Sequence, residues 1–219
     1  MNNSLHGQSG KGQNSIVKIN DSAVDKYQMT PVDKLVAHFR QSIDLTDHEL
    51  GIIADSFNLV ELKKKEVLLF AGDHSSHMRF IAQGCLRSYY MDPDAKEHIV
   101  QFGIEDWWIN DLYSYLTNTP AKQFIQAIEP SQVLQIHKNR LKDLYNSIPT
   151  IERFFRIKFQ NAYISLQERT INTMSKTAEE RYVEFRSKHR DIEQRVPQYM
   201  VASYLGITPE FLSSLRKNS

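Results

Sequence analysis

The chain has 219 residues, with 27 Lys+Arg and 26 Asp+Glu, and a formal net charge of +1 at pH 7. Its 41% hydrophobic and 24% charged residues are ordinary for a globular protein, which excludes disorder throughout. A single cysteine cannot form an internal disulfide or supply the thiolates of a zinc or iron–sulfur site. Because no apolar run approaches the roughly 18–20 residues of a membrane span and no signal peptide is visible, we expect a cytoplasmic protein without a membrane partner.

The first 28 residues consist largely of Asn, Ser, Gly, Gln and Lys. Such a segment buries too little apolar surface to offset its conformational entropy. We therefore predict a disordered tail over residues 1–28. We also hypothesise that Met29, where the composition changes, is the native start of the protein.

Two short amphipathic helices are predicted next. Thr30 suits an N-cap and Pro31 suits the first helical position, and apolar residues follow them with helical spacing. Thr46 precedes Glu49 by three residues, which is the capping-box pattern at the start of a second helix.

The pattern then changes to that of strands. Short runs rich in β-branched and aromatic residues are separated by turn sequences such as Ala71-Gly72-Asp73. The predicted strands are residues 66–70, 78–82, 85–90, 98–102, 124–128 and 133–136. Short strands at this regular spacing are typical of an antiparallel barrel or sandwich.

Helical spacing returns after His137. A stretch from Pro149 to about Thr173 contains neither Pro nor Gly, and it has more apolar surface than a single helix seam needs. We predict a long helix that packs against its own domain and against a second subunit; the alternative is a core helix of a monomer. The candidate dimer-interface residues are Phe155, Phe159, Tyr163 and Leu166.

The C-terminal segment has the pattern of a helix-turn-helix. Pro197 suits the first turn of one helix, Gly206 supplies a left-handed turn residue, and Thr208 and Pro209 cap and start a second helix. Ala202 is small enough for the two helices to cross closely. The predicted outward residues, candidates for reading a DNA groove, are Thr208, Pro209, Glu210, Ser213, Ser214 and Lys217. A generic helical hairpin with the same spacing is the alternative.

The charge distribution gives weak support to DNA binding. Residues 149–219 hold 12 Lys+Arg and 8 Asp+Glu, a net charge of +4, which leaves −3 for residues 1–148. The basic half therefore coincides with the predicted helix-turn-helix. Because the excess is small, we expect modest or strongly salt-dependent affinity.

The order of these elements resembles the Crp/Fnr superfamily of bacterial transcription regulators, over about Thr30 to Lys217. Its most specific motifs are Gly206 with Glu210 four residues later, and the strand sequence Arg79-Phe-Ile-Ala-Gln-Gly-Cys-Leu-Arg-Ser-Tyr. The resemblance implies an α+β fold. Its parts would be an antiparallel, jelly-roll-like β-roll (a double-stranded β-helix) with flanking helices over residues 29–148, a dimerisation helix over 149–175, and a winged-helix-like helix-turn-helix lacking most of the wing over 176–219.

In that family the β-roll senses a ligand, the long helix dimerises, and paired recognition helices read a palindrome. The resemblance thus implies a homodimeric regulator with double-stranded DNA, RNA polymerase and a small effector as partners. Glu210 falls on the family's base-reading Glu, which accepts a hydrogen bond from a cytosine amino group. Pro209 and Ser214 fall where better-known members carry arginines, so the sequence specificity should differ from theirs.

The sensor half departs from the family's cyclic-nucleotide binders. Residues 107–123 contain neither the Gly of the ribose-binding turn nor the Arg that holds the cyclic phosphate. A Lys at that place cannot offer a bidentate fork, so classical cAMP binding is not expected. A pocket for another effector could be lined by Trp107, Trp108, Asn110, Asp111, Tyr113, Lys122, Leu166 and Gln167. Equally, the aromatic residues could simply fill the roll.

Other chemistry finds little support. His74 and His77 are predicted in a solvated loop rather than a metal or haem site, and Cys85 is predicted as a buried apolar residue. No nucleophile elbow, phosphate loop or paired-carboxylate pattern indicates an enzyme, and no cofactor or metal is expected. The cysteine count excludes an iron–sulfur sensor of the Fnr kind. The alternative function is a ligand-binding or protein-interaction module whose helix-turn-helix has lost DNA binding.

Overall fold

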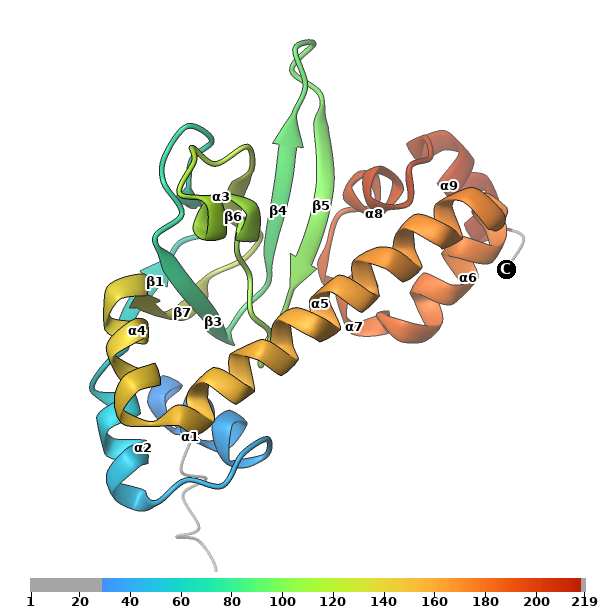
Figure 1. Ribbon diagram of the computed structural model, residues 1–219. Coiled ribbons are helices and arrows are strands. Elements are labelled where there is room, and N and C mark those ends of the chain that lie inside the picture. The colour runs from blue at the N-terminus through green and yellow to red at the C-terminus, as the bar shows by residue number, and fades with distance from the viewer. Residues whose placement is uncertain (1–28, 218–219) are drawn as a thin grey trace, which may run out of the picture.

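The computed structural model describes residues 29–217. The predicted disordered tail, residues 1–28, lies outside these residues, and the start at Met29 stays a hypothesis. In the described part, helices lie at both ends of the chain and antiparallel strands lie between them (Figure 1). No helix in residues 29–217 is both long and apolar enough to cross a membrane.

The two predicted N-terminal helices are confirmed as α1 (Pro31–Arg40) and α2 (Asp47–Ala54). Each begins with a capping box. Thr30 Oγ1 accepts a hydrogen bond from the Asp33 amide at 3.1 Å, and Thr46 Oγ1 accepts one from the Glu49 amide at 3.3 Å. The N3 carboxylates in turn accept the amides of the two threonines. These contacts satisfy donors that the first turn of a helix leaves free.

The strands form two antiparallel sheets rather than a closed barrel. The three-stranded sheet has the order β1-β7-β3 and the four-stranded sheet the order β2-β6-β4-β5. The strands are β1 (Asn58–Leu62), β2 (Val67–Leu69), β3 (His77–Gln83), β4 (Leu86–Met91), β5 (Glu97–Gly103), β6 (Phe124–Ala127) and β7 (Ser131–His137). The predicted strands are confirmed within two residues, whereas β1 was missed. It lies at a sheet edge and buries only Leu62, so its sequence carries little alternation.

The interior of the roll is filled by side chains. Leucine, isoleucine, valine and alanine from both sheets pack there with Ile109 and Ala121. Gly84 allows the sheets to approach closely: its φ is +104°, and a Cβ at this position would lie 2.1 Å from Ser131 Oγ. Any larger residue there would force the turn between β3 and β4 away from β7.

Helices cover the other face of the three-stranded sheet. Helix α4 (Lys138–Ser147) and the first turns of α5 (Pro149–Ser175) join α1 and α2 there, around Phe39, Phe80 and Phe154. The long helix predicted from Pro149 is confirmed, and it leads away from the roll to the C-terminal helices (Figure 1). The remaining helices are α3 (Leu112–Thr117), α6 (Ala178–Lys188), α7 (Arg190–Arg195), α8 (Gln198–Leu205) and α9 (Pro209–Lys217).

His38 is buried where α1, the roll and α5 meet. Its ring lies 5.0 Å from that of Phe80 and 5.8 Å from that of Phe154, and its Nε2 accepts a hydrogen bond from Trp108 Nε1 at 3.3 Å. An acceptor nitrogen cannot be protonated. Desolvation, and secondarily the charge of Lys158, lowers the pKa of His38 from 6.5 to about 4.

Acid should therefore destabilise the fold through His38. Its pKa is lower in the folded than in the unfolded chain, so the unfolded state binds more protons and stability falls as the pH drops from 6.5 towards 4. A shift of this size costs about 2 kcal/mol between pH 7 and pH 5. The neutral variant His38→Gln, which keeps an acceptor for Trp108, should lose that part of the pH dependence in urea unfolding. The exposed His48→Gln serves as the control, and equal pH profiles for the two variants would contradict this assignment.

Candidate DNA-binding and effector sites

The C-terminal helix-turn-helix forms as predicted. Helix α8 ends at Gly206, whose φ of 68° and ψ of 34° are left-handed, and the Ile207 amide then donates to the Ala202 carbonyl at 3.0 Å. Thr208 Oγ1 accepts the Phe211 amide at 3.2 Å and so caps α9. This short turn fixes the crossing of α8 and α9.

The faces of the two helices separate clearly. The residues that lock the pair are buried: Val201, Ala202, Leu205, Leu212 and Leu215. All the predicted groove-reading residues are exposed: Thr208, Pro209, Glu210, Ser213, Ser214 and Lys217. Two further residues of α9, Phe211 and Arg216, are also exposed and were not among the predicted candidates. A helical wheel would have found Phe211, because it falls beside the buried stripe rather than within it.

The helix-turn-helix is attached to the edge of the four-stranded sheet. Ser203 of α8 accepts the Ile99 amide and donates to the Glu97 carbonyl, both at 3.0 Å. Arg169 of α5 donates to the carbonyls of Val100 at 2.5 Å and Tyr204 at 2.9 Å. Side chains of α5 and α8 thus cap the outer edge of β5.

Apolar and ionic contacts complete this attachment. Cys85, Tyr89, Ile99, Phe102 and Ile128 of the roll share one hydrophobic cluster with residues of α6–α9. Arg195 of α7 bonds to Glu105 at 2.7 Å and also to Glu129, and Glu105 accepts the Gly84 amide at 2.7 Å. These contacts raise the pKa of the Arg195 guanidinium and lower that of the Glu105 carboxyl despite its partial burial. We call this contact region between the roll and α6–α9 the seam. No sequence pattern predicted it, because its residues lie far apart in the chain.

Helix α5 ends at Ser175, close to the start of α6. Lys176 has an extended backbone, and Thr177 opens α6 with a capping box. Arg181 donates to the carbonyl of Lys176 at 2.7 Å and to that of Leu205 at 3.3 Å. One guanidinium therefore joins the C-terminal ends of α5 and α8, where the helix dipole favours a cation.

Phe155, one of the candidate dimer-interface residues, lies in the core of its own chain. Phe155 is 1% exposed and packs within its own chain, with its ring 5.0 Å from that of Trp108, so its assignment to a dimer interface is wrong. It follows Phe154, and both rings belong to the core around α1 and α4. Phe159 is half-buried, while Tyr163 and Leu166 are 66% and 59% exposed.

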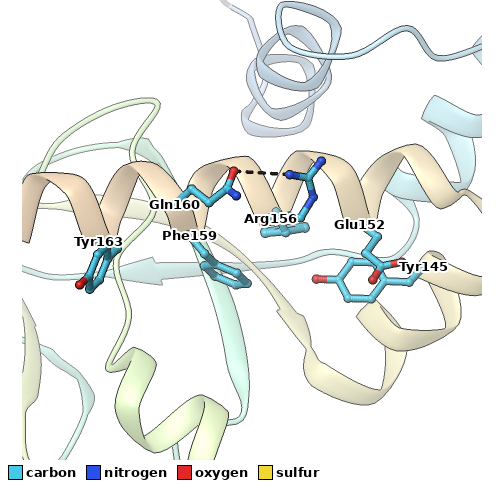
Figure 2. Close-up of a pocket in the computed structure, with 7 residues that line it drawn as sticks. Tyr145, Glu152, Arg156, Phe159, Gln160 and Tyr163 are labelled. Carbon is cyan, nitrogen blue, oxygen red and sulfur yellow. Dashed lines mark hydrogen bonds between the residues drawn. The ribbon is translucent and has the colours of Figure 1, made fainter.

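The exposed face of α5 is broadly apolar. Phe159 and Tyr163 project from the same side of the helix, one turn apart, along a shallow groove of about 480 Å³ that begins at Tyr145 (Figure 2). Farther around the helix, Ile157, Ile164 and Ile171 recur every seven residues and are also exposed. Met174, near the end of the helix, is 79% exposed.

The predicted effector residues are dispersed. Trp108 belongs to the core and donates to His38, whereas the ring of Trp107 lies 5.8 Å from that of His189. Leu166 and Gln167 lie on the exposed face of α5. The structure does not bring these side chains into one pocket, and Trp108 packs with the cluster around α1 and α5 rather than in the interior of the roll.

The remaining candidates lie around α3. Asp111 caps this helix through the Ser114 amide, and its second carboxylate oxygen accepts the Lys122 amide, both at 3.0 Å. Lys122 Nζ lies 5.3 Å from the centre of the Tyr113 ring. The buried Asn110 keeps an unpaired Oδ1. Asp111 therefore orders a turn, and its carboxylate oxygens are already used by backbone donors.

No metal centre is found among the described residues: no group of three or more His, Cys, Asp or Glu is placed to hold an ion. His77 is paired with His137, the rings being 5.1 Å apart, and burial lowers its pKa to about 4. Cys85 is buried as predicted, and burial raises the pKa of its thiol to about 12, which makes it a poor nucleophile.

The chain is similar to known regulatory proteins over most of its length. The profile described as "Cyclic nucleotide-binding domain" matches residues 59–147. The Anaerobic regulatory protein of Aggregatibacter actinomycetemcomitans is 28% identical over 188 residues, covering 78% of this chain and 70% of that protein. The Fumarate and nitrate reduction regulatory protein of Yersinia pestis is 27% identical over 188 residues, covering 78% and 72%. These matches support the resemblance of the chain to transcription regulators of the Crp/Fnr superfamily.

Two solved structures share the fold. FixK2 from Bradyrhizobium japonicum superposes with a TM-score of 0.63 at 16% identity, covering 74% of this chain and 83% of that one. A CooA mutant from Carboxydothermus hydrogenoformans gives 0.61 at 18% identity, covering 84% and 83%. The predicted β-roll with helix-turn-helix is thus confirmed, and residues 176–217, as far as they are described, are helical without a strand. The relatives are named as regulators, in agreement with the prediction that the chain is not an enzyme.

The turn of this helix-turn-helix should depend on Gly206. Its left-handed φ would cost an alanine about 1–2 kcal/mol, although nothing among the described residues lies within 4 Å of an added Cβ. Gly51, inside α2 and equally open, is the matched control, where alanine should stabilise by about 0.5–1 kcal/mol. Urea unfolding measures both variants. A neutral Gly206→Ala would mean that the turn is not constrained as described.

Proposed function

We propose that the protein is a homodimeric transcription regulator of the Crp/Fnr type that reads a palindromic DNA operator with α9. The observation that carries the proposal is the polar, exposed face of α9, with Glu210, Ser214 and Lys217 outward while Leu212 and Leu215 hold the helix against α8. In such motifs the second helix enters the major groove and its N-terminal residues contact base edges.

The apolar face of α5 supports the dimer. Tyr163, Leu166 and Met174 expose most of their surface along one helix, which a stable monomer rarely does. A second copy of α5 packed against this face would bury both stripes and place two α9 helices on the same side of the pair. Recognition helices paired in this way read half-sites about 34 Å apart.

The charges of α9 support recognition of bases more than of phosphates. Glu210 is exposed in the first turn, where a carboxylate can accept a hydrogen bond from a cytosine amino group. Arg216 and Lys217 lie in the last turn, within reach of the phosphate backbone. Because Pro209 and Ser214 stand where long cationic side chains could contact bases, discrimination between base pairs would depend on few contacts, chiefly that of Glu210.

Control by a small effector remains part of the proposal. A ligand in the roll would act through its different affinity for two placements of the DNA-binding helices. Classical cAMP is not proposed, because Lys122 lies over the Tyr113 ring and the buried Arg87 is already bound by Glu97 at 2.5 Å and by Gln126 at 2.7 Å. Neither offers a free fork to a cyclic phosphate.

Glu210→Ala should relax the preference at one base pair in each half-site. Losing the acceptor removes about 1–3 kcal/mol of discrimination at that pair while leaving binding to other sequences nearly unchanged. Selection of operators from random duplex, followed by titration of each single-base variant, measures this. Glu179→Ala, an exposed carboxylate on α6, is the control. If wild-type protein selects no sequence, the DNA-binding proposal fails and an interaction module becomes the better interpretation.

Leu166→Asp should dissociate the dimer. Two leucines lose their burial and two carboxylates face each other, at a cost of about 3–4 kcal/mol per dimer. Analytical ultracentrifugation with the full chain measures the state, and Val183→Asp, 54% exposed on α6, is the matched control. A wild-type monomer, or a dimer unaffected by Leu166→Asp, would contradict the assigned face.

A further inference from the structure

Helix α9 carries an exposed aromatic residue beside its polar face. Phe211 is the third residue of the helix, follows Glu210 directly and is 46% exposed. The packing against α8 does not need it, because Leu212 and Leu215, at 0% and 9% exposure, already form the buried stripe. The exposed ring therefore lies beside a candidate groove-reading residue and is available for contact with a ligand.

The position of Phe211 is fixed by its own backbone. Its amide donates to Thr208 Oγ1, so the first turn of α9 is held in one geometry. Side chains on a helix lean towards its N-terminus, which directs the ring towards the end of α9 that enters a groove first. Ser214, three residues later on the same flank, is short and leaves the ring free to approach a surface.

We propose that Phe211 is a specificity-determining residue that reads the C5-methyl group of a thymine next to the base pair read by Glu210. This inference rests on the proposed DNA binding by α9. A phenyl ring has no hydrogen-bonding group, so it cannot use the donor and acceptor pattern of the major groove. The thymine methyl is the apolar feature that the groove displays, and apolar side chains contact it.

Glu210 and Phe211 would then recognise two different bases. Glu210 requires a donor and selects cytosine, whereas Phe211 rewards a methyl group and selects thymine. Such a pair gives each half-site a two-base preference without an arginine at Pro209 or Ser214. Contact with the thymine methyl group also removes the Phe211 ring from water. A base without the methyl group would leave part of the ring exposed to solvent.

Uracil substitution tests the contact, because uracil differs from thymine only by the methyl group. Operators are first selected from random duplex with the full-length protein. Each thymine of the selected half-site is then replaced in turn by deoxyuridine, and affinity is measured by fluorescence anisotropy. At one position next to the Glu210-dependent base, the loss for wild-type protein should be about fourfold per half-site, the value of one buried methyl group. Phe211→Ala should show no loss there.

Control variants distinguish the role of Phe211 from DNA binding by α9 itself. Tyr199→Ala removes another exposed aromatic, 52% exposed on α8, and should keep the uracil effect, while Phe211→Leu should keep part of it. Thermal melting of each variant establishes that the fold is retained. If the wild type selects a Glu210-dependent operator but tolerates uracil everywhere, or if uracil weakens wild type and Phe211→Ala equally, the role of Phe211 is refuted while DNA binding stands. If no operator is selected, both proposals fall.

Discussion

The arrangement of the molecule depends on how the edge of strand β5 is closed. An edge strand exposes unpaired amides and carbonyls, and here Ser203 of α8 and Arg169 of α5 bond to them. The same side chains that satisfy the sheet therefore fix the position of the helix-turn-helix. Around them, Tyr89, Ile99 and Phe102 share one apolar cluster with α6–α9, so the four-stranded sheet and the C-terminal helices have a common core. Separating them would expose apolar surface and reopen the edge of the sheet at once.

This seam constrains how a regulatory signal could travel. The roll is filled, and its contacts with the C-terminal helices include those of β5 and those of Glu105 and Glu129 in the adjoining turns. Arg195 bonds to both carboxylates, so a shift of either turn changes the support of α7 and of α8 behind it. A ligand can alter the placement of α9 only if it binds one arrangement of this seam better than another. A change in the placement of α9 relative to α5 would alter the extended backbone at Lys176 and the hydrogen bonds of Arg181 to Lys176 and Leu205.

Local signals in the sequence predicted most of the fold. Thr30, Thr46 and Thr177 each accept the amide of the residue three positions on, and the turn at Gly206 needs only its own backbone. Contacts between distant segments were not predictable. The bond from Ser203 to Ile99 spans more than a hundred residues, and nothing near Ser203 indicates it. Phe155 was misplaced for the same reason: its helix is apolar on several sides, and only the positions of Trp108 and Tyr145 decide which side is the core. The effector residues were grouped by resemblance, although Asp111 and Trp108 have structural roles here.

The distribution of charge makes pairing through α5 essential to the proposed operator recognition. Residues 149–219 carry a net charge of only +4, and α9 itself has two cations, Arg216 and Lys217. Few phosphate contacts per subunit mean a weak complex with one half-site. Two half-sites bound by one rigid dimer combine their free energies, because the second α9 is already held near its groove. A chain with this sparse basic surface therefore gains specificity and affinity together from the same apolar face of α5. For this reason the apolar face of α5 from Tyr163 to Met174 is as important to the proposed operator recognition as Glu210.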